Sequence, residues 1–398
     1  MKRRPAVLYI SYDGMLEPLG QSQVISYLER LAPDYAIHLV SFEKPADREH
    51  EDKVAATQSR LDKAGIVWHP LNYHKSPTLP ATLFDIGQGT LVSLWLVLRH
   101  RVSLIHARSY IPALIGWAVK LLTGANLLFD IRGFWADERT DGGIWPKGGR
   151  TYRVAKRLEK SLMLAADHIV TLTHASKEVI AAFPYFRGNP PPITVIPTCA
   201  DLDRFKPDPT QRRSEFTLGY VGSIGTWYLF DEVIECFRLL RERRANARLL
   251  VVNRNEQDLV RKSAAAAGIP AACVEIVAAD HAEVPDYVRR MNAGAAIIRP
   301  VFSKIASAPT KLAEYLGCGV PCLGNTGVGD MELILEREGC GVALSEFTPQ
   351  ERSRAVDRLL AMADDPEIAA RCREVALAHF SNADGAKRYR EIYRSIMP

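Results

Sequence analysis

One segment of the chain combines residue types that bind phosphate groups and sugar hydroxyls. It reads Ser307-Ala-Pro-Thr-Lys-Leu-Ala-Glu-Tyr-Leu-Gly-Cys-Gly-Val-Pro-Cys322 and is typical of a polar loop, a short helix and a buried strand. Ser307 and Thr310 can accept hydrogen bonds from the free N–H groups at a helix start. Lys311 places a cation at that N-terminus, which favours anions, and Glu314 adds an acceptor for a sugar diol. The pattern indicates a nucleotide or nucleotide-sugar site, with an ordinary helix cap as the alternative.

Length and composition set the class of protein. At 398 residues, 47% hydrophobic and 24% charged, the chain predicts a globular protein of two domains. Met1-Lys-Arg-Arg-Pro leads directly into an apolar strand pattern, so no secretory signal is expected. No run reaches the roughly 18 apolar residues expected of a membrane span. The seven cysteines, all from Cys199 onward, lack zinc or CxxC spacing, which favours a reducing cytoplasm.

The net positive charge of the chain lies in its first half, where acidic residues are fewer. Residues 1–200 hold 24 of the 51 Lys and Arg residues but only 18 of the 46 Asp and Glu residues. An anionic membrane surface or a phosphate-bearing acceptor would suit this half. No nucleic-acid recognition motif with interleaved aromatic residues is present, so a nucleic-acid partner is not expected.

Short β-branched runs alternate with helical patterns along the whole chain. We expect strands at 7–11, 36–42, 66–71, 104–106, 127–131, 168–172 and 194–196, and again at 217–221, 247–252, 274–277, 295–298 and 320–324. Such alternation predicts parallel, doubly wound sheets. The Pro- and polar-rich stretch 207–214 predicts a linker between domains spanning 1–206 and 215–380. The fold class is therefore α/β, with two Rossmann-like domains facing a cleft.

Glycines follow the first expected strand of the second domain. Neither half carries GxGxxG there, which disfavours a dinucleotide-dependent dehydrogenase. Gly222-Ser223-Ile-Gly225 still allows close backbone approach to an anion, with a tight strand–helix turn as the alternative. Walker A, HExxH and GxSxG patterns are absent from the sequence.

Five further landmarks carry a family resemblance when they are taken in order. They are LIHARSY at 104–110, DIRGFW at 130–135, AADHIVTLT at 165–173, VIPTCAD at 195–201 and GYVG at 219–222. With the Ser307–Cys322 segment, the chain resembles the retaining glycosyltransferases of family 4, which have the GT-B fold. The resemblance covers nearly the full length. It implies transfer of a sugar from a nucleotide-sugar to an acceptor, often a lipid-linked glycan or polysaccharide precursor. It also implies that a final helix, 381–398, returns to the N-terminal domain.

The chain departs from this family at the diphosphate site. Relatives usually carry two glutamates eight positions apart; Glu314 matches the second, which holds the ribose, but the first falls on Ala306. The usual Arg and Lys of the glycine loop fall on Ser223 and Tyr228. Another group must stabilise the charge that develops on the leaving diphosphate. Lys311 is the first candidate, and Arg299 and Lys304 follow. A solvated surface charge is the alternative for each of the three.

The resemblance also points to residues of the N-terminal domain. Relatives often place a His near the position of Arg132, whose guanidinium could clamp a phosphate or the donor sugar, unless neighbouring acids hold it in a structural pair. His106 follows a strand and is either a site residue or a core histidine. The acceptor-side candidates are Gly20, Gln21, Ser22, Asp130 and Glu138, of which the first three equally fit a simple helix start.

The family's reaction needs no protein nucleophile. The acceptor hydroxyl attacks on the face that the diphosphate leaves, and a phosphate oxygen takes the proton. Catalysis is then mainly positioning and electrostatics, for which we assign Arg132, Lys311 and His106. No metal triad appears in the sequence, so neither a metal nor another cofactor is expected, and the nucleotide-sugar is a substrate.

Two segments bear on membrane contact. The expected helix 150–165 carries Arg153, Lys156, Arg157 and Lys160 on one face, which suits anionic headgroups, although a solvated face is the alternative. The apolar stretch Leu91–Leu98, with Trp95, is interpreted as a core helix rather than a membrane-inserted one.

Three functional hypotheses follow. The first is a cytoplasmic glycosyltransferase, peripheral on the inner face of the membrane, acting on a glycan or polyprenyl-linked acceptor in bacterial exopolysaccharide, capsule or lipopolysaccharide assembly. The second is a GT-B nucleotide-sugar epimerase, and the third is a catalytically silent nucleotide-sugar-binding protein.

Overall fold

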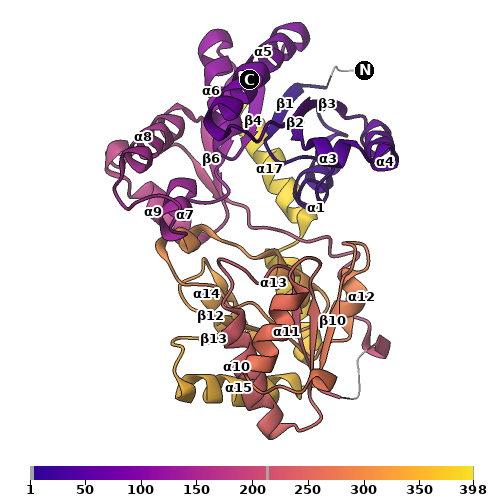
Figure 1. Ribbon diagram of the computed structural model, residues 1–398. Coiled ribbons are helices and arrows are strands. Elements are labelled where there is room, and N and C mark those ends of the chain that lie inside the picture. The colour runs from indigo at the N-terminus through magenta and orange to yellow at the C-terminus, as the bar shows by residue number, and fades with distance from the viewer. Residues whose placement is uncertain (1–3, 212–214, 398) are drawn as a thin grey trace. The chain divides into compact units, whose positions relative to one another are not determined.

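The chain divides between Ile196 and Pro197 and again between Ser381 and Asn382 in the computed structural model, which describes residues 4–211 and 215–397 (Figure 1). The first unit holds the residues up to Ile196 and those from Asn382 onward, and the second holds the residues between. The first boundary lies before the predicted linker 207–214, of which 212–214 fall outside the described residues.

The first unit is built on a parallel sheet, seven-stranded in the described residues, with the order β3-β2-β1-β4-β5-β6-β7. Its strands are β1 (Ala6–Ser11), β2 (Ala36–Glu43), β3 (Val67–Asn72), β4 (Leu104–Arg108), β5 (Asn126–Asp130), β6 (His168–Thr171) and β7 (Ile193–Val195). Chain order reverses between β1 and β4, and ligands of such sheets bind beyond the carboxyl ends of the strands at this point.

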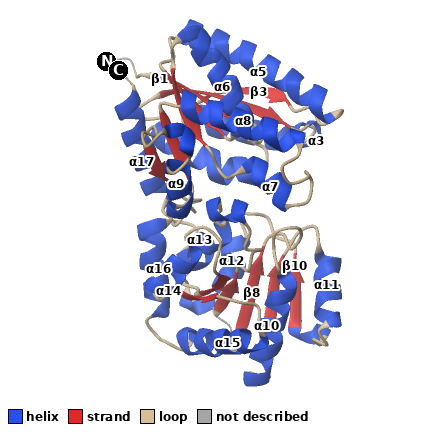
Figure 2. Ribbon diagram, turned by 90° about the vertical axis from the view of Figure 1, so that its left-hand side faces the viewer, coloured by secondary structure: helices blue, strands red, loops and turns tan. Residues whose placement is uncertain are grey.

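Helices cover both faces of this sheet. They are α1 (Pro18–Gly20), a π-helical turn η1 (Gln21–Ile25), α2 (Ser26–Leu31), α3 (Pro45–Arg48), α4 (Glu51–Lys63), α5 (Thr78–His100), α6 (Tyr110–Thr123), α7 (Trp135–Asp141), α8 (Arg150–Ala165), α9 (His174–Ala181), the 3-10 turn η2 (Pro184–Phe186) and α17 (Asn382–Ile396). Neighbouring helices α5, α6 and α8 lie on the same side of the sheet (Figure 2).

The long helix α5 is buried on one side only. Leu96 and Val97 are buried, whereas Leu91, Trp95 and Leu98 are more than half exposed. The interpretation of this stretch as a core helix is therefore wrong for its outer side. The sequence pattern is apolar all round the helix, so it could not reveal which side faces solvent.

Helix α17 completes the first unit. Its buried residues Asn382, Gly385, Ala386 and Tyr389 follow the i, i+3, i+4, i+7 spacing of a single face, which Ile392 and Tyr393 continue. That face packs on α2, and the Tyr389 hydroxyl donates to Asp130 at 2.9 Å. The C-terminal helix thus belongs to the N-terminal unit, from Asn382 onward.

The second unit has a parallel sheet with the order β10-β9-β8-β11-β12-β13 in the described residues, and chain order reverses between β8 and β11. Its strands are β8 (Thr217–Val221), β9 (Arg248–Val252), β10 (Val274–Val277), β11 (Ala293–Ala295), β12 (Cys322–Asn325) and β13 (Gly341–Leu344). Its helices are η3 (Pro209–Gln211), α10 (Phe230–Arg243), α11 (Gln257–Ala266), η4 (Ala271–Cys273), α12 (Val284–Arg289), η5 (Phe302–Ala306), α13 (Thr310–Gly317), α14 (Met331–Arg337), α15 (Pro349–Ala363) and α16 (Ile368–His379).

The segment after Pro197 belongs to the second core because its side chains are buried there. Leu202 and Phe205 are 4% and 1% exposed. The Arg373 guanidinium of α16 donates to both of their carbonyls, at 2.8 and 2.6 Å. These contacts explain why the boundary precedes the Pro-rich stretch. The predicted fold class, two Rossmann-like α/β domains with parallel sheets, is confirmed.

Candidate functional site

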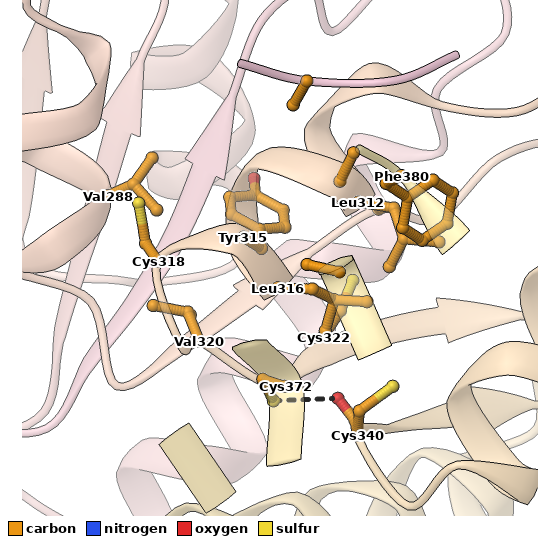
Figure 3. Packing of buried hydrophobic residues seen from close by; sticks show 14 of the residues in the cluster. Val288, Leu312, Tyr315, Leu316, Cys318, Val320, Cys322, Cys340, Cys372 and Phe380 are labelled. Atoms are coloured by element: carbon orange, nitrogen blue, oxygen red, sulfur yellow. Dashed lines mark hydrogen bonds between the residues drawn. The ribbon is translucent and has the colours of Figure 1, made fainter. Parts of the chain in front are cut away.

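Helix α13 lies against the switch point of the second sheet, and a buried tyrosine fixes it there. The Tyr315 hydroxyl accepts from the Val221 N–H at 2.9 Å and donates to the Ala295 carbonyl at 3.3 Å. It thereby joins α13 to β8 and β11, the two strands at the reversal. Figure 3 shows Leu312, Tyr315 and Leu316 of α13 among the buried residues of this core.

Gly294 makes room for this arrangement. A Cβ at Gly294 would lie 2.6 Å from the Tyr315 ring. We expect Gly294→Ala to cost about 1–3 kcal/mol of unfolding free energy, because overpacking displaces the ring. It should also weaken nucleotide binding, because α13 moves with the ring. Urea unfolding and calorimetric titration would check both effects.

Gly87→Ala serves as the control for this prediction. Nothing lies within 4 Å of a Cβ at this helical position, so alanine should leave binding unchanged and raise stability slightly. Equal stability of the Gly294→Ala protein and wild type would contradict the positioning role of Tyr315.

The glycine loop, residues 222–225, follows β8 and is fixed by hydrogen bonds with side chains that follow β9. Gly222 has φ +95°, a conformation that favours glycine, and both it and Ser223 are exposed. The Asn253 amide donates to the Gly222 carbonyl at 3.0 Å and to Glu256 at 2.9 Å. Asn253 and Glu256 were not predicted from the sequence. Their place just after the carboxyl end of β9 was the only feature that could have indicated a role.

The Glu256 carboxylate also supports Gly225 and its neighbour. It accepts from the Ile224 N–H at 3.0 Å, and a Cβ at Gly225 would lie 3.1 Å from its other oxygen. The loop is thus fixed by side chains on one side and presents backbone on the other.

Lys311 lies directly under this loop. Its side chain is buried at 6% exposed, and a Cβ at Gly222 would lie 3.8 Å from its Nζ. The ammonium sits 3.9 Å from the ring centroids of both Tyr220 and Tyr228. Among the described residues, its Nζ has no hydrogen-bond partner. A buried cation held only by ring faces is poised for an anion.

Glu314 lies on the next turn of α13 and is 7% exposed. Burial lowers the pKa of Lys311 to about 7, partly opposed by Glu314. Burial likewise raises the pKa of Glu314 to about 7, opposed by Lys311 and Arg204. Both groups therefore change charge readily near neutral pH, and a bound anion or diol would shift them.

The other donor-site candidates lie around α13. Pro309 is the N-cap of this helix and no side chain caps it, so the expectation that Ser307 or Thr310 caps α13 is wrong. Both are half-buried. Arg299 is exposed, whereas the Lys304 ammonium lies 4.0 Å above the Trp227 ring and its side chain is buried. Ala306, the position of the missing glutamate, is 1% exposed.

The first unit has a buried charge cluster at its own switch point. Asp130, at the end of β5, is fully buried, with Arg132 at 3.7 Å, Arg108 at 3.9 Å and His106 at 3.7 Å. Burial acts to raise the pKa of Asp130, but Arg132, His106 and Arg108 outweigh it and the pKa falls. Arg132 has φ +56°, a strained conformation for this residue.

Arg108 is the residue of this cluster that sequence reasoning missed. It is 3% exposed and also lies 3.5 Å from Asp13, beyond β1. Its position at the end of β4, inside the LIHARSY landmark, was the available signal. Arg132 does pair with Asp130, whereas Asp137 instead accepts from Tyr152 and Lys156. Glu138 is half-buried on α7 near Gly133.

His106 is a buried residue rather than an exposed one. It is 1% exposed, and its Nδ1 lies 2.7 Å from the Tyr393 hydroxyl of α17. Burial lowers its pKa, outweighing the opposing effect of Asp130. This arrangement supports α17 and Asp130, and gives His106 no exposed surface for a substrate.

The first helical turns of the chain, around Gly20 to Ser22, are stabilised by hydrogen bonds within the first unit. Gln21 donates to the Met15 carbonyl at 2.7 Å and accepts from Arg60 at 2.6 Å, and Ser22 donates to the Pro18 carbonyl at 2.8 Å. A Cβ at Gly20 would lie 2.1 Å from the Gly14 carbonyl oxygen. The polar groups of Gln21 and Ser22 are thus used inside the unit, which favours the helix-start reading over acceptor contact.

Solved structures of similar fold include three glycosyltransferase-type proteins. Sucrose-phosphate synthase from Thermosynechococcus elongatus is 16% identical, with 99% of each chain covered and a TM-score of 0.73. A glycosyltransferase from Rickettsia africae is 13% identical, with 99% of this chain and 98% of that one covered and a TM-score of 0.70. Anabaena HepE in complex with UDP and glucose is 15% identical, with 98% and 99% covered and a TM-score of 0.67. No curated protein matches the chain.

Two family models match adjoining parts of the sequence. Residues 21–204 match the model described as Glycosyltransferase Family 4, and residues 203–377 match Glycosyl transferases group 1. The two matches meet at residues 203 and 204, a few residues inside the second unit, so each model accounts for most of one sheet and its helices. The chain belongs to the family 4, group 1 glycosyltransferases and has their GT-B architecture.

Proposed function

We propose that this enzyme is a retaining transferase that moves a sugar from a nucleotide-sugar to a glycan or polyprenyl-linked acceptor in bacterial cell-surface polysaccharide synthesis. The main evidence for a nucleotide-sugar site is the Lys311 ammonium, which has no hydrogen-bond partner among the described residues and lies next to the exposed Gly222 loop. Glu314, one turn further along α13, supplies an acceptor for the ribose hydroxyls.

Lys311 takes over the role of the cations that relatives carry at Ser223 and Tyr228. Its ammonium lies against the ring of Tyr228, one of the two positions where relatives carry a cation. The positive charge is therefore supplied by helix α13 instead of the loop after β8. A diphosphate at the loop would meet this charge, the loop N–H groups and the uncapped start of α13. In a buried setting, one such charge stabilises a leaving diphosphate far more than it would in water.

Binding of the diphosphate also sets the protonation of the site. An anion beside Nζ favours the ammonium, so it raises the pKa of Lys311 from about 7 toward its ordinary range. The lysine is then charged when charge develops on the leaving group. No side chain need act as a nucleophile in this reaction.

In the first unit we assign Arg132 to anionic or hydroxyl groups of the substrates, with the buried Arg108 beside it as a positioning residue for Asp130. Their guanidiniums lie at the carboxyl ends of β4 and β5, held by Asp130. His106 and Tyr389 act as positioning residues that fix Asp130 from behind. We assign no chemical role to Glu138 or to the helical turns from Gly20 to Ser22.

Likeness to HepE, solved with UDP and with UDP-glucose, supports a nucleotide-sugar donor. We expect the enzyme to work in the cytoplasm, peripherally on the inner face of the membrane, where polyprenyl-linked acceptors are available. The excess of basic residues in the first half supports that location.

Donor consumption tests this proposal. Purified enzyme is incubated with each nucleotide-sugar, with and without a polyprenyl-phosphate-linked sugar, and products are followed by NMR. Acceptor-dependent release of nucleoside diphosphate with an unchanged anomeric configuration is expected. Interconversion of the donor sugar without acceptor would instead establish an epimerase, and no turnover with tight nucleotide binding would establish a silent binding protein.

A further inference from the structure

Helix α5 exposes an unusually apolar outer side. Leu79, Leu83, Phe84, Leu91, Trp95 and Leu98 are each 57 to 71% exposed. They recur at the spacing of one helical face, opposite the side that packs on the sheet. Single exposed leucines are ordinary on a protein surface, but six large apolar residues on one helix face mark an interaction site.

The apolar surface continues onto the neighbouring helices. Leu121 and Leu122, at the end of α6, are 70 and 67% exposed, and α6 packs beside α5. Val154, Leu158 and Leu164 are exposed on α8, which packs beside α6 (Figure 2). We call the outer faces of these three helices the α5–α6–α8 surface.

The charges on this surface have one sign. Within α5, α6 and α8 the acidic residues are Asp85 and Glu159, and both are buried, at 0 and 1% exposed. Arg99, Arg153, Arg157 and Lys160 are exposed on the same helices. Lys156 differs from the predicted basic stripe, because it turns inward to pair with Asp137 and Glu159.

We infer that the α5–α6–α8 surface docks on an anionic lipid bilayer, with the apolar side chains in the headgroup–acyl boundary and the basic residues on lipid phosphates. Apolar residues with a tryptophan among them, flanked by Arg and Lys and free of exposed acids, match the chemistry of such an interface. A second copy of the chain fits less well, because a two-fold contact would bring the like charges of α8 together.

Helix α5 lies along this interface rather than across it. By length and composition alone, its 23 residues could cross a membrane. In the folded unit, however, its inner side packs on β1, β2 and α6, and its buried Asp85 binds Tyr12 at 2.8 Å. The inference gives the proposed membrane-side function its docking surface, and lipid binding does not depend on the transferase activity.

Vesicle co-sedimentation of the full chain tests the inference. The probes are vesicles of phosphatidylcholine alone and of phosphatidylcholine with phosphatidylglycerol. Wild type should sediment with the anionic vesicles. The variant Leu91→Ser/Trp95→Ser/Leu98→Ser should lose about tenfold or more of its partition coefficient, because each side chain leaves the apolar layer. Arg153→Gln/Arg157→Gln/Lys160→Gln should lose at least about tenfold, on anionic vesicles only.

The matched control is Leu259→Ser/Leu333→Ser/Leu377→Ser in the second unit, where these leucines are 47 to 49% exposed. It should bind vesicles like wild type. Equal sedimentation of the α5 variant and wild type would overturn the inference. So would absence of wild type from every pellet, or a wild-type dimer that the α5 substitutions convert to a monomer, which would assign the surface to a second copy.

A nucleotide-binding measurement on the same proteins separates the two proposals. The α5 variant should bind nucleoside diphosphate like wild type, since it leaves α13 untouched. Vesicle binding by a wild-type protein that binds no nucleotide would contradict the proposed transferase site and support the lipid-docking surface. Nucleotide binding without vesicle binding would support the transferase site and contradict the lipid-docking surface.

Discussion

Replacement of Lys311 by methionine is expected to slow sugar transfer by about 10² to 10³ without damaging the fold. Methionine fills the space between Tyr220 and Tyr228 but carries no charge for the diphosphate. Loss of one preorganised charge at a developing anion lowers kcat/KM by about 10² to 10³. Stability should stay equal or rise, because the substitution removes a buried charge that lacks a hydrogen-bond partner. Donor kinetics and urea unfolding measure the two effects.

The sign of the pH dependence follows from the lowered pKa of Lys311, about 7 in the folded protein. Unfolded lysine titrates much higher, so charging Lys311 costs folding free energy most below pH 7, and the cost fades as pH rises toward the ordinary lysine value. The stability gained by Lys311→Met should thus be larger near about pH 6 than near about pH 9. Affinity for the diphosphate should fall as pH rises through 7, because the ammonium is lost.

Two variants keep this prediction open to refutation. Lys262→Met alters an exposed lysine of the second unit and should change neither activity nor stability. Lys311→Arg keeps a permanent charge, so any nucleotide binding it retains should no longer weaken above pH 7. If Lys311→Met kept a tenth or more of wild-type kcat/KM, the charge would have to come from Lys304 or Arg299 instead.

Removal of the Asp130 carboxylate is expected to have the largest effect on stability. Asp130→Ala removes the carboxylate that Arg132 pairs with and leaves the buried Arg108 with only the half-exposed Asp13, at a cost of about 3–5 kcal/mol. It also removes the acceptor of the Tyr389 hydroxyl, so α17 should detach more easily from the first unit. Urea unfolding and limited proteolysis of the C-terminal helix would report both consequences.

Two milder substitutions calibrate this result. Tyr389→Phe removes a single hydrogen bond to Asp130 and should cost about 1–2 kcal/mol. Asp13→Asn alters a 42% exposed partner of Arg108 and should cost less than about 1 kcal/mol. A cost for Asp130→Ala no greater than that for Asp13→Asn would show that the cluster is not the electrostatic centre of the first unit.

Much of the fold was predictable from local pattern. Buried strands such as β8 show their apolar pattern within a few contiguous residues, and β8 was predicted with the observed bounds. Strand β13 was missed because its pattern of four residues is too brief to stand out. The boundary at Pro197 was missed because burial of Leu202 and Phe205 depends on α16, far along the chain.

The candidate site was predictable in its residues but not in its geometry. The sequence indicated Lys311 as a site residue, but it indicated Tyr228 only as a position where the lysine of relatives is missing. In the structure Tyr228 and Tyr220, both distant in sequence, form the walls that hold the Lys311 ammonium. Arg108 was overlooked for a similar reason, because only the parallel register of β4 and β5 places it beside Asp130.

A thermal-shift screen tests the central claim, the donor site on α13, most directly. Wild type, Lys311→Ala and Glu314→Ala are melted with UDP, GDP, ADP, TDP and their sugars. At about 100 times its Kd, the matching nucleotide should stabilise wild type by about 2.7 kcal/mol and stabilise neither variant. If folded wild type responded to none of these ligands, or both variants responded as wild type does, the nucleotide-sugar site would not lie on α13.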